Sequence, residues 1–427
     1  MRSAADSATP VTIYGAGTGL VGGAVAQEGW IVSTERLKML EVHHSTVRAG
    51  AGITLRELQA AARAAGMFYP PDPTEQSASL GGAIATNASG SRSFRYGPTR
   101  RWVRALTVVL ASGEIRRWRR GQRLDFPVPA IPIPATTKNT AGYHLEDGMD
   151  WVDLFIGSEG TLGVVVEAEL ALLPLPRALI TGVVFLPGDE AVVRAVEEWR
   201  LIDGLRMLEY LDGRSLELLR PDYPEIPPKP GGALLVEQEP VVEADAALDE
   251  WLDRLEAAGA DLDRSWFAAG EGDRERFRQF RHALPETVNR LLRRRGLMKL
   301  GSDYAVPLGC NGEMLAYYRR RADEEFPGAY VIFGHIGDAH LHVNLLPSCP
   351  EEFGRGRELM LEFARRAVAL GGTVSAEHGL GKRKAELLEI QYSHDEIEAM
   401  RTVKRRLDPE WILGRGNMFA TASALPL

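Results

Sequence analysis

Cysteine is nearly absent from this sequence. Only Cys310 and Cys349 occur among its 427 residues, and two cysteines exclude the disulfide framework of a small secreted domain. Long apolar runs are also missing, because no stretch approaches 18 uninterrupted apolar residues, which argues against a membrane-spanning helix. Residues 1–10 lack the basic and apolar regions of a signal peptide. We therefore expect a cytoplasmic protein, with peripheral attachment to a membrane through a partner as the alternative.

Positive charge is scarce relative to negative charge. The chain carries 50 lysines and arginines against 58 aspartates and glutamates, which gives a formal net charge of −8. This balance argues against bulk binding of nucleic acid or anionic membranes, which requires a basic surface. Glycine and proline are plentiful instead, at 44 and 25 residues, and indicate a loop-rich protein that handles a ligand. The length suggests two or three domains.

Hydrophobic periodicity and turn residues predict a mixed α and β chain. In the N-terminal part they predict a strand at residues 10–14, a helix at 54–65 that begins with a capping box, and a hairpin at 105–118. Beyond the prolines at 174 and 176, strands and helices in mixed order predict an antiparallel sheet backed by helices. The arginine runs at 116–123, 293–295 and 319–321 are interpreted as solvated charge.

Three stretches of small residues lie at 15–19, 77–90 and 157–163. The first follows a strand, but a dinucleotide fingerprint would place its third glycine at position 20, which is Leu20, so a Rossmann site is rejected. Bare backbone N–H groups in such loops can approach a phosphate closely. Three loops of this kind in one region predict a bulky, phosphate-containing cofactor.

Histidines and a carboxylate gather near the C-terminal end. On a strand, His340 and His342 would share one face, and Glu377 lies in a tight glycine-flanked loop beside His378. Two imidazoles and a carboxylate suit Zn²⁺, with Mn²⁺ and Fe²⁺ as alternatives. A lone histidine is more often a satisfied core residue than a ligand, so the residues alone leave both interpretations open.

Seven motifs together carry a resemblance to a known family. They read GAGTGLVGGA (15–24), PPDPTEQSASLGGAIATNASG (70–90), TKNTAGY (137–143), FIGSEGTLGVV (155–165), FGHIGDAHLHVNLL (333–346), SAEHGLGKRK (375–384) and LDPEWILGRGNMF (407–419). In this order they resemble the FAD-linked oxidase family, whose FAD domain is of the PCMH or vanillyl-alcohol-oxidase type. The resemblance is to its D-lactate dehydrogenase, glycolate oxidase flavin-subunit and D-2-hydroxyglutarate dehydrogenase branch.

The resemblance implies an α+β fold. A bipartite PCMH-type FAD-binding domain would be interrupted by a substrate domain with an antiparallel sheet backed by helices. The expected parts are an FAD-binding domain at 1–176, a substrate domain with the histidines at 177–370, and a C-terminal segment at 371–427 that returns to the FAD domain. The family usually has a further strand and helix before the glycine strand, so the N-terminal βαβ unit is expected to be truncated.

The resemblance also assigns cofactor and substrate contacts. FAD would be bound by Gly15, Gly17, Thr18, Gly19, Leu20, Ser77, Gly81, Gly82, Asn87, Gly90, Glu159, Gly160, Val165 and Asn417. The substrate would be bound by Arg281, Lys299 and Asn344, and Arg281 could equally be a surface charge. A threonine of the D-2-hydroxyglutarate enzymes corresponds to Pro285, which favours a shorter substrate.

The implied chemistry is the oxidation of a 2-hydroxy acid. His335, His342 and Glu377 would bind the metal, His378 would accept the hydroxyl proton, and a hydride would pass to flavin N5. His340 departs from the family's usual asparagine, and either an extra ligand or a space-filling role remains open.

We expect an FAD-dependent D-2-hydroxy-acid dehydrogenase, with D-lactate or glycolate as the favoured substrate. The alternatives are a D-2-hydroxyglutarate dehydrogenase, an alkyl-glycerone-phosphate synthase-type flavoenzyme and an accessory subunit of a glycolate oxidase. The expected partners are the 2-hydroxy acid and an electron acceptor, which could be a quinone, a cytochrome, an electron-transfer flavoprotein or an iron–sulfur subunit. A homodimer is one oligomeric form left open.

Overall fold

A five-stranded antiparallel sheet organises the N-terminal part of the chain. The computed structural model describes residues 1–420. The strand order is β3 (Leu40–His43), β4 (Thr46–Gly50), β8 (Val164–Ala171), β6 (Val103–Val109) and β7 (Ile115–Arg119). A separate parallel pair is formed by β1 (Val11–Tyr14) and β2 (Trp30–Ser33). The short elements around them are α1 (Arg2–Asp6), α2 (Leu55–Ala64), β5 (Met67–Phe68), α3 (Leu80–Ala85), α4 (Ser93–Tyr96), η1 (Thr99–Arg101), α5 (Trp151–Phe155) and β9 (Leu173–Pro174).

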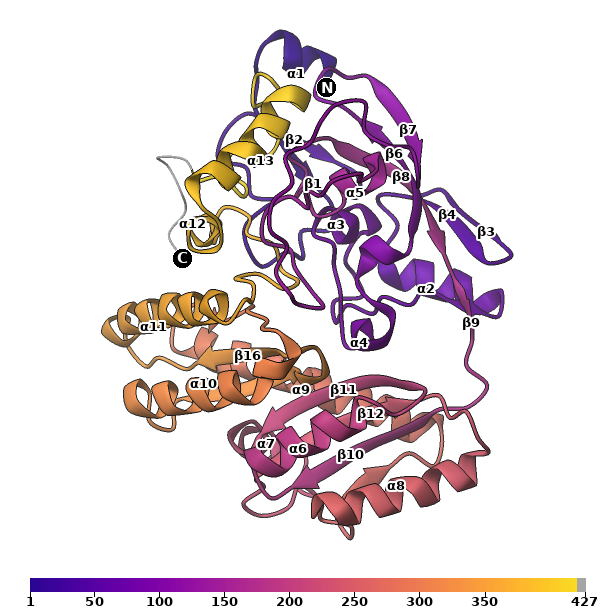
Figure 1. The fold of residues 1–427 in the computed structure, drawn as a ribbon, viewed down its shortest axis with the longest axis vertical. Coiled ribbons are helices and arrows are strands. Elements are labelled where there is room, and N and C mark those ends of the chain that lie inside the picture. The colour runs from indigo at the N-terminus through magenta and orange to yellow at the C-terminus, as the bar shows by residue number, and fades with distance from the viewer. Residues whose placement is uncertain (421–427) are drawn as a thin grey trace.

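A seven-stranded antiparallel sheet organises the following part, drawn in the lower half of Figure 1. Its strands in order are β13 (Trp266–Phe267), β10 (Ile180–Leu186), β12 (Gly232–Gln238), β11 (Leu205–Asp212), β15 (Tyr330–His335), β16 (His340–Leu345) and β14 (Leu300–Gly301). Its helices are α6 (Asp189–Trp199), α7 (Gly213–Leu219), α8 (Ala244–Ala258), α9 (Glu271–Arg294), α10 (Asn311–Glu325) and α11 (Pro350–Ala369), with short turns at η2 (Leu308–Cys310) and η3 (Ile336–Asp338).

Both faces of this sheet are covered, which explains why β10 and β12 are buried at every position and mostly apolar. Along β10, Val183 and Phe185 pack into one core with α7 and α9. The alternate residues Val184 and Leu186 pack into the other core with α6 and α8. Successive side chains of a strand point to opposite faces, so a continuous apolar run needs two layers of helices.

The C-terminal segment packs against the N-terminal strand. After η4 (Ala385–Leu387) and α12 (Leu388–Gln391), α13 (His394–Leu407) lies in the upper part of Figure 1 near α1 and β1. The N–H of Val11 donates to the carbonyl of Ile412 at 2.6 Å, and Val11 also forms a parallel bridge with Leu413. Both ends of the described chain therefore contribute to one packed unit.

Several predicted elements form as expected, and the arginine runs include an exception. Helix α2 begins with the predicted capping box, in which the Glu57 N–H donates to Thr54 Oγ1 and the Thr54 N–H donates to the Glu57 carboxylate. Helix α10 was not predicted, and its Arg319 is not simply solvated. The Arg319 guanidinium donates to Asp189 at 3.0 Å and to the buried Asp212 at 2.8 Å. The interpretation of residues 319–321 as solvated charge was therefore wrong for Arg319, because two carboxylates distant in sequence meet it.

Within residues 1–420, no helix is both long enough and apolar enough to cross a membrane.

Candidate active site

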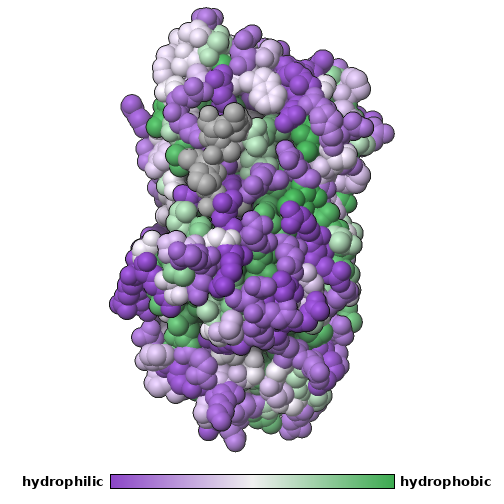
Figure 2. Space-filling view, turned by 90° about the vertical axis from the view of Figure 1, so that its left-hand side faces the viewer, coloured by the Kyte–Doolittle hydropathy of each residue, from purple (hydrophilic) through white to green (hydrophobic). Residues whose placement is uncertain are grey.

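One large cavity lies between the five-stranded and seven-stranded parts of the molecule. Its volume is about 1000 Å³, and its walls come from the three glycine-rich loops, from β15, β16 and α9, and from the loop that follows α11. On the face seen in Figure 2, hydrophobic side chains gather at mid-height, where the upper and lower parts of the molecule meet. The cavity is large enough for a cofactor and a small substrate together.

The loop at residues 15–20 forms a cradle of unpaired backbone donors. Among the described residues, the N–H groups of residues 15–20 donate to no other protein group. Gly17 has φ +69°, and a Cβ on Gly15 would lie 2.3 Å from the Ser79 hydroxyl oxygen. Side chains other than glycine would strain or widen this turn. A cradle of free N–H groups facing a cavity fits the phosphates of FAD.

Most of the predicted FAD contacts line the cavity, and three do not. The lining includes Gly15, Gly17, Thr18, Gly19, Leu20, Gly81, Gly82, Gly90, Glu159, Gly160 and Val165. Outside it, the Ser77 hydroxyl donates to Glu75, the Asn87 side-chain oxygen accepts from the Arg100 N–H, and the Asn417 amide donates to Gly23 and Glu159 carbonyls. These three side chains are therefore bonded to other protein groups rather than directed into the cavity. Ser79 also lines the cavity, although it was not among the predicted FAD contacts.

The three predicted metal ligands come together at the inner part of the cavity. Glu377 Oε1 lies 3.2 Å from His335 Nε2 and 3.5 Å from His342 Nε2. One nitrogen of His340 completes a group whose ligand atoms all lie within 4.8 Å of one another. We refer to His335, His340, His342 and Glu377 as the histidine cluster. Nitrogen and carboxylate donors at these separations fit a divalent cation such as Zn²⁺.

Outer partners fix the orientation of the predicted ligands. The Glu209 carboxylate lies 2.6 Å from His335 Nδ1, and the Ser302 carbonyl lies 3.0 Å from His342 Nδ1. Each ring therefore keeps Nε2 directed at the cluster, as metal-binding histidines usually do. Burial alone would lower the pKa of His335, but the carboxylates of Glu209 and Glu377 together raise that pKa to about 9. The surroundings of this ring thus favour positive charge.

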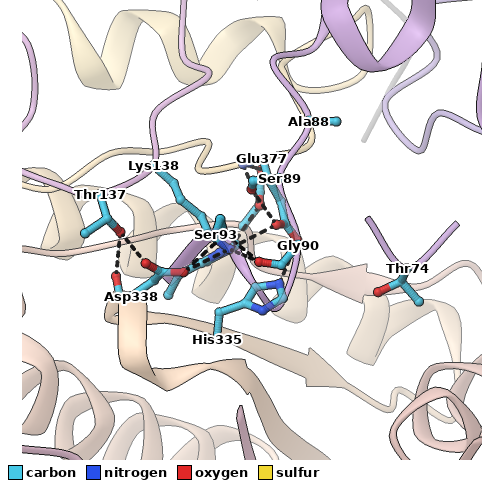
Figure 3. Close-up of polar contacts among 12 residues, drawn as sticks. Thr74, Ala88, Ser89, Gly90, Ser93, Thr137, Lys138, His335, Asp338 and Glu377 are labelled. Atoms are coloured by element: carbon cyan, nitrogen blue, oxygen red, sulfur yellow. Dashed lines mark hydrogen bonds and ion pairs between the residues drawn. The ribbon is translucent and has the colours of Figure 1, made fainter. Parts of the chain in front are cut away.

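Lys138 forms an ion pair with only one of the two carboxylate oxygens of Glu377. Its ammonium is fully buried and lies 3.3 Å from Glu377 Oε2 and 3.4 Å from Asp338. Ser89 donates a further hydrogen bond to Glu377 Oε2 at 3.0 Å. Figure 3 shows Lys138 reaching between Asp338 and Glu377, with His335 on the other side. Oε1 is therefore left free to face the imidazoles.

His378 is suited to accept a proton. Its Nδ1 lies 3.4 Å from the fully buried Asp303, whose other oxygen accepts from the His378 N–H at 2.9 Å. Burial is the main cause that lowers the pKa of His378 to about 4. The ring is therefore neutral at neutral pH and can serve as a base.

The predicted substrate residues all line the cavity, but they differ in their partners. Arg281 donates to Glu209 at 2.8 Å and to Thr74 at 3.2 Å, so it is not a free surface charge. Lys299 lines the cavity, and its side chain is exposed. Asn344 is fully buried, and neither atom of its amide has a hydrogen-bond partner among the described residues. An unsatisfied amide in a cavity wall is free to bind a polar ligand.

Three functional-looking residues were missed by sequence reasoning. Glu209 and Asp303 orient His335 and His378 from strands or loops far away in sequence, and no spacing rule links them. Lys138 stands inside the quoted TKNTAGY motif, so the motif carried a signal that went unused. Tyr143 of the same motif does not reach the cavity, because its hydroxyl is bonded to Thr161 at 2.6 Å.

Two protein-family models match the chain. One is described as "FAD linked oxidases, C-terminal domain" and matches residues 175–418. The other is described as "FAD binding domain" and matches residues 1–119. The two matches follow one another along the sequence and include every residue of the histidine cluster.

Curated relatives align over nearly the whole chain. Glycolate oxidase subunit GlcD of Bacillus subtilis is 31% identical, and the alignment covers 96% of this chain and 84% of the relative. D-2-hydroxyglutarate dehydrogenase of Xanthomonas citri is 33% identical, with 99% and 87% covered. D-lactate dehydrogenase of Archaeoglobus fulgidus is 31% identical, with 98% and 88% covered. Each alignment spans more than four fifths of the relative.

A solved structure with a similar fold is an alkyldihydroxyacetonephosphate synthase. It superposes with a TM-score of 0.68 and covers 97% of this chain and 72% of its own, at 17% identity. Identity at this level supports the fold alone. The match, with the antiparallel sheets backed by helices, confirms the predicted α+β class with a PCMH-type FAD-binding fold.

Proposed function

The chain belongs to the family of FAD-linked oxidases and is an FAD-dependent oxidoreductase, and from this premise we propose that it oxidises a D-2-hydroxy acid to the 2-oxo acid. D-lactate or glycolate is the favoured substrate. The observation that carries the proposal is that His335, His342, Glu377 and His378 line the same cavity as the free N–H cradle of residues 15–20. Relatives that carry the names D-lactate dehydrogenase and glycolate oxidase subunit support this class of substrate.

The proposed base is His378. Its ring is neutral at neutral pH, and Asp303 at Nδ1 would favour the tautomer that leaves Nε2 free to accept the substrate's hydroxyl proton. The same carboxylate would then stabilise the imidazolium that forms. FAD, when bound, supplies the acceptor for the two electrons that leave the substrate carbon.

The proposed metal ligands are His335, His342 and Glu377. A divalent cation held there supplies a Lewis acid that lowers the pKa of a hydroxyl group. Lys138 and Ser89 hold the second oxygen of Glu377, so that its first oxygen stays directed at the imidazoles.

The proposed substrate carboxylate site comprises Lys299, Arg281 and Asn344. Among the described residues, the Lys299 ammonium has no carboxylate partner and the Asn344 amide is unsatisfied, and both residues line the cavity. Pro285, also in the cavity wall, offers no side-chain donor, which supports a short substrate over a diacid. We also propose the domain limits 1–176, 177–370 and 371–427. The electrons would leave the flavin for a separate electron acceptor.

Anaerobic mixing of the FAD-loaded protein with single substrates tests the proposal. We expect D-lactate or glycolate to bleach the visible flavin absorbance, and L-lactate serves as the control of opposite handedness. Bleaching by D-2-hydroxyglutarate in preference to both would correct the substrate within the class. If no 2-hydroxy acid reduces the bound flavin, the proposed reaction is wrong.

A further inference from the structure

His340 is the member of the histidine cluster for which sequence reasoning left two roles open. It is fully buried on β16, and its ring centroid lies 4.5 Å from that of His342 and 5.3 Å from that of His335. Neither ring nitrogen has a hydrogen bond of good geometry among the described residues. A buried imidazole without such a partner is costly unless it binds something else.

Space-filling alone does not account for this position. A residue that only fills space would avoid that cost with an apolar side chain of similar volume. Here one nitrogen of His340 lies within 4.8 Å of the ligand atoms of His335, His342 and Glu377. The separations of 3.2 and 3.5 Å join Glu377 Oε1 to His335 and His342, and the nitrogen of His340 lies beside these three ligand atoms.

The three imidazoles of the cluster share a pattern of outer partners. His335 has Glu209 at Nδ1, and His342 has the Ser302 carbonyl at Nδ1. His340 has the Asp303 carboxylate 3.2 Å from its Nε2. In each ring, one nitrogen lies near an oxygen acceptor, and this leaves the other nitrogen for a metal ion.

We propose that His340 is a fourth protein ligand, so that the cation is held by three imidazoles and one carboxylate. This inference rests on the metal of the proposed function. The additional ligand makes the site richer in nitrogen than two histidines and one carboxylate, which favours Zn²⁺ over Mn²⁺. Asp303 would then orient both the metal ligand His340 and the proposed base His378, because it contacts both rings.

X-ray absorption fine structure of the zinc-loaded, FAD-loaded wild-type protein counts the imidazoles bound to the metal. We expect three imidazoles in the wild type and two in His340→Gln, whose amide retains a donor near the position of Nε2. In competition with a chelator, this variant should bind Zn²⁺ more weakly by well over 10²-fold, because the loss of an outer partner costs only about 10–100-fold. His282→Gln is the matched control, because His282 lines the same cavity but lies outside the cluster, and it should bind Zn²⁺ like the wild type.

The outcomes separate this inference from the proposed function. Two imidazoles in the wild type would overturn the role of His340 and leave the three other ligands in place. A wild type that binds no metal would overturn both the inference and the metal of the proposed function. If His340→Gln does not fold, the imidazole count of the wild type decides by itself.

Discussion

At the scale of the residue, the site depends on buried charges whose partners come from other elements. The Asp303 carboxylate lies near the His378 ring and accepts the backbone N–H of His378, and the Glu209 carboxylate contacts the His335 ring. Both carboxylates are buried, and each has a second partner, because Asp303 also lies near His340 and Glu209 also accepts from Arg281. Replacement of the His378 ring should therefore directly affect the proposed transfer of the substrate's hydroxyl proton.

Replacement of His378 by asparagine should slow substrate reduction of the flavin by about 10²–10⁴-fold, because the proton acceptor is lost. FAD should stay bound, since the cradle at residues 15–20 is distant from this ring in sequence and uses backbone donors. Rapid-mixing absorbance measurements under anaerobic conditions provide the rate. His282→Asn is the control, and unchanged rates in His378→Asn would remove the assignment of the base.

Glu159 gives a second prediction, which concerns pH. Its carboxylate accepts the N–H groups of Leu380 and Gly381 at 2.7 Å each, and burial raises its pKa from 4.5 to about 7. The folded protein thus holds this proton more tightly than the unfolded chain. This contribution to stability is full below pH 4.5 and is lost as the pH rises to about 7, by up to about 3 kcal/mol.

The variant Glu159→Gln cannot titrate at this position. Its stability relative to the wild type should therefore become more favourable between pH 5 and pH 8, whatever its value at the lower pH. Urea unfolding of both FAD-loaded proteins at the two pH values provides the comparison. A difference in stability that does not change with pH would contradict the raised pKa.

At the scale of the element, the glycine-rich loops need glycine for close packing as well as for its backbone freedom. A Cβ on Gly90 would lie 1.9 Å from the Asp72 carbonyl oxygen, and a Cβ on Gly81 would lie 2.8 Å from Ala51 Cβ. These contacts hold the loops against one another so that their backbones line the cavity. Small residues at these positions are therefore required by packing.

Gly90→Ala should force the backbone at residue 72 or residue 90 to move. We expect a lower melting temperature and weaker FAD binding, because Gly90 lies in the cavity wall. Gly188→Ala is the matched control, since its Cβ would meet no atom within 4 Å and its backbone is extended. Thermal unfolding and FAD titration measure both effects, and equal behaviour of the two variants would contradict the packing argument.

At the scale of the whole molecule, ion pairs that are buried or partly buried join the N-terminal part to the seven-stranded sheet. Arg92, just before α4, contacts Asp72 at 3.0 Å and donates to Glu237 of β12 at 2.8 Å. Arg206 of β11 lies 3.5 Å from the same Glu237. The cavity lies where these two parts meet, so this network also fixes the relative position of its walls.

Arg92→Met should destabilise the protein by about 2–3 kcal/mol, because Asp72 loses its cation and Glu237 keeps only Arg206. Urea unfolding measures this loss. The matched control is Lys38→Met, which removes an exposed pair with Glu57 and should cost no more than about 1 kcal/mol. Equal losses of unfolding free energy in the two variants would show that the Arg92 network contributes no more than an exposed ion pair.

Local residue patterns predicted a mixed α and β chain, the capping box of α2 and the motifs that identify the family. These features depend on local periodicity and on residue types that only certain turns accept. Which glycine-loop residues face the cavity, and which side chains orient the histidines, was decided by the tertiary structure. Glu209, Asp303 and Lys138 reach the site from three separate segments, and only the packing of the two sheets brings their charges within hydrogen-bond distance of His335, His378 and Glu377.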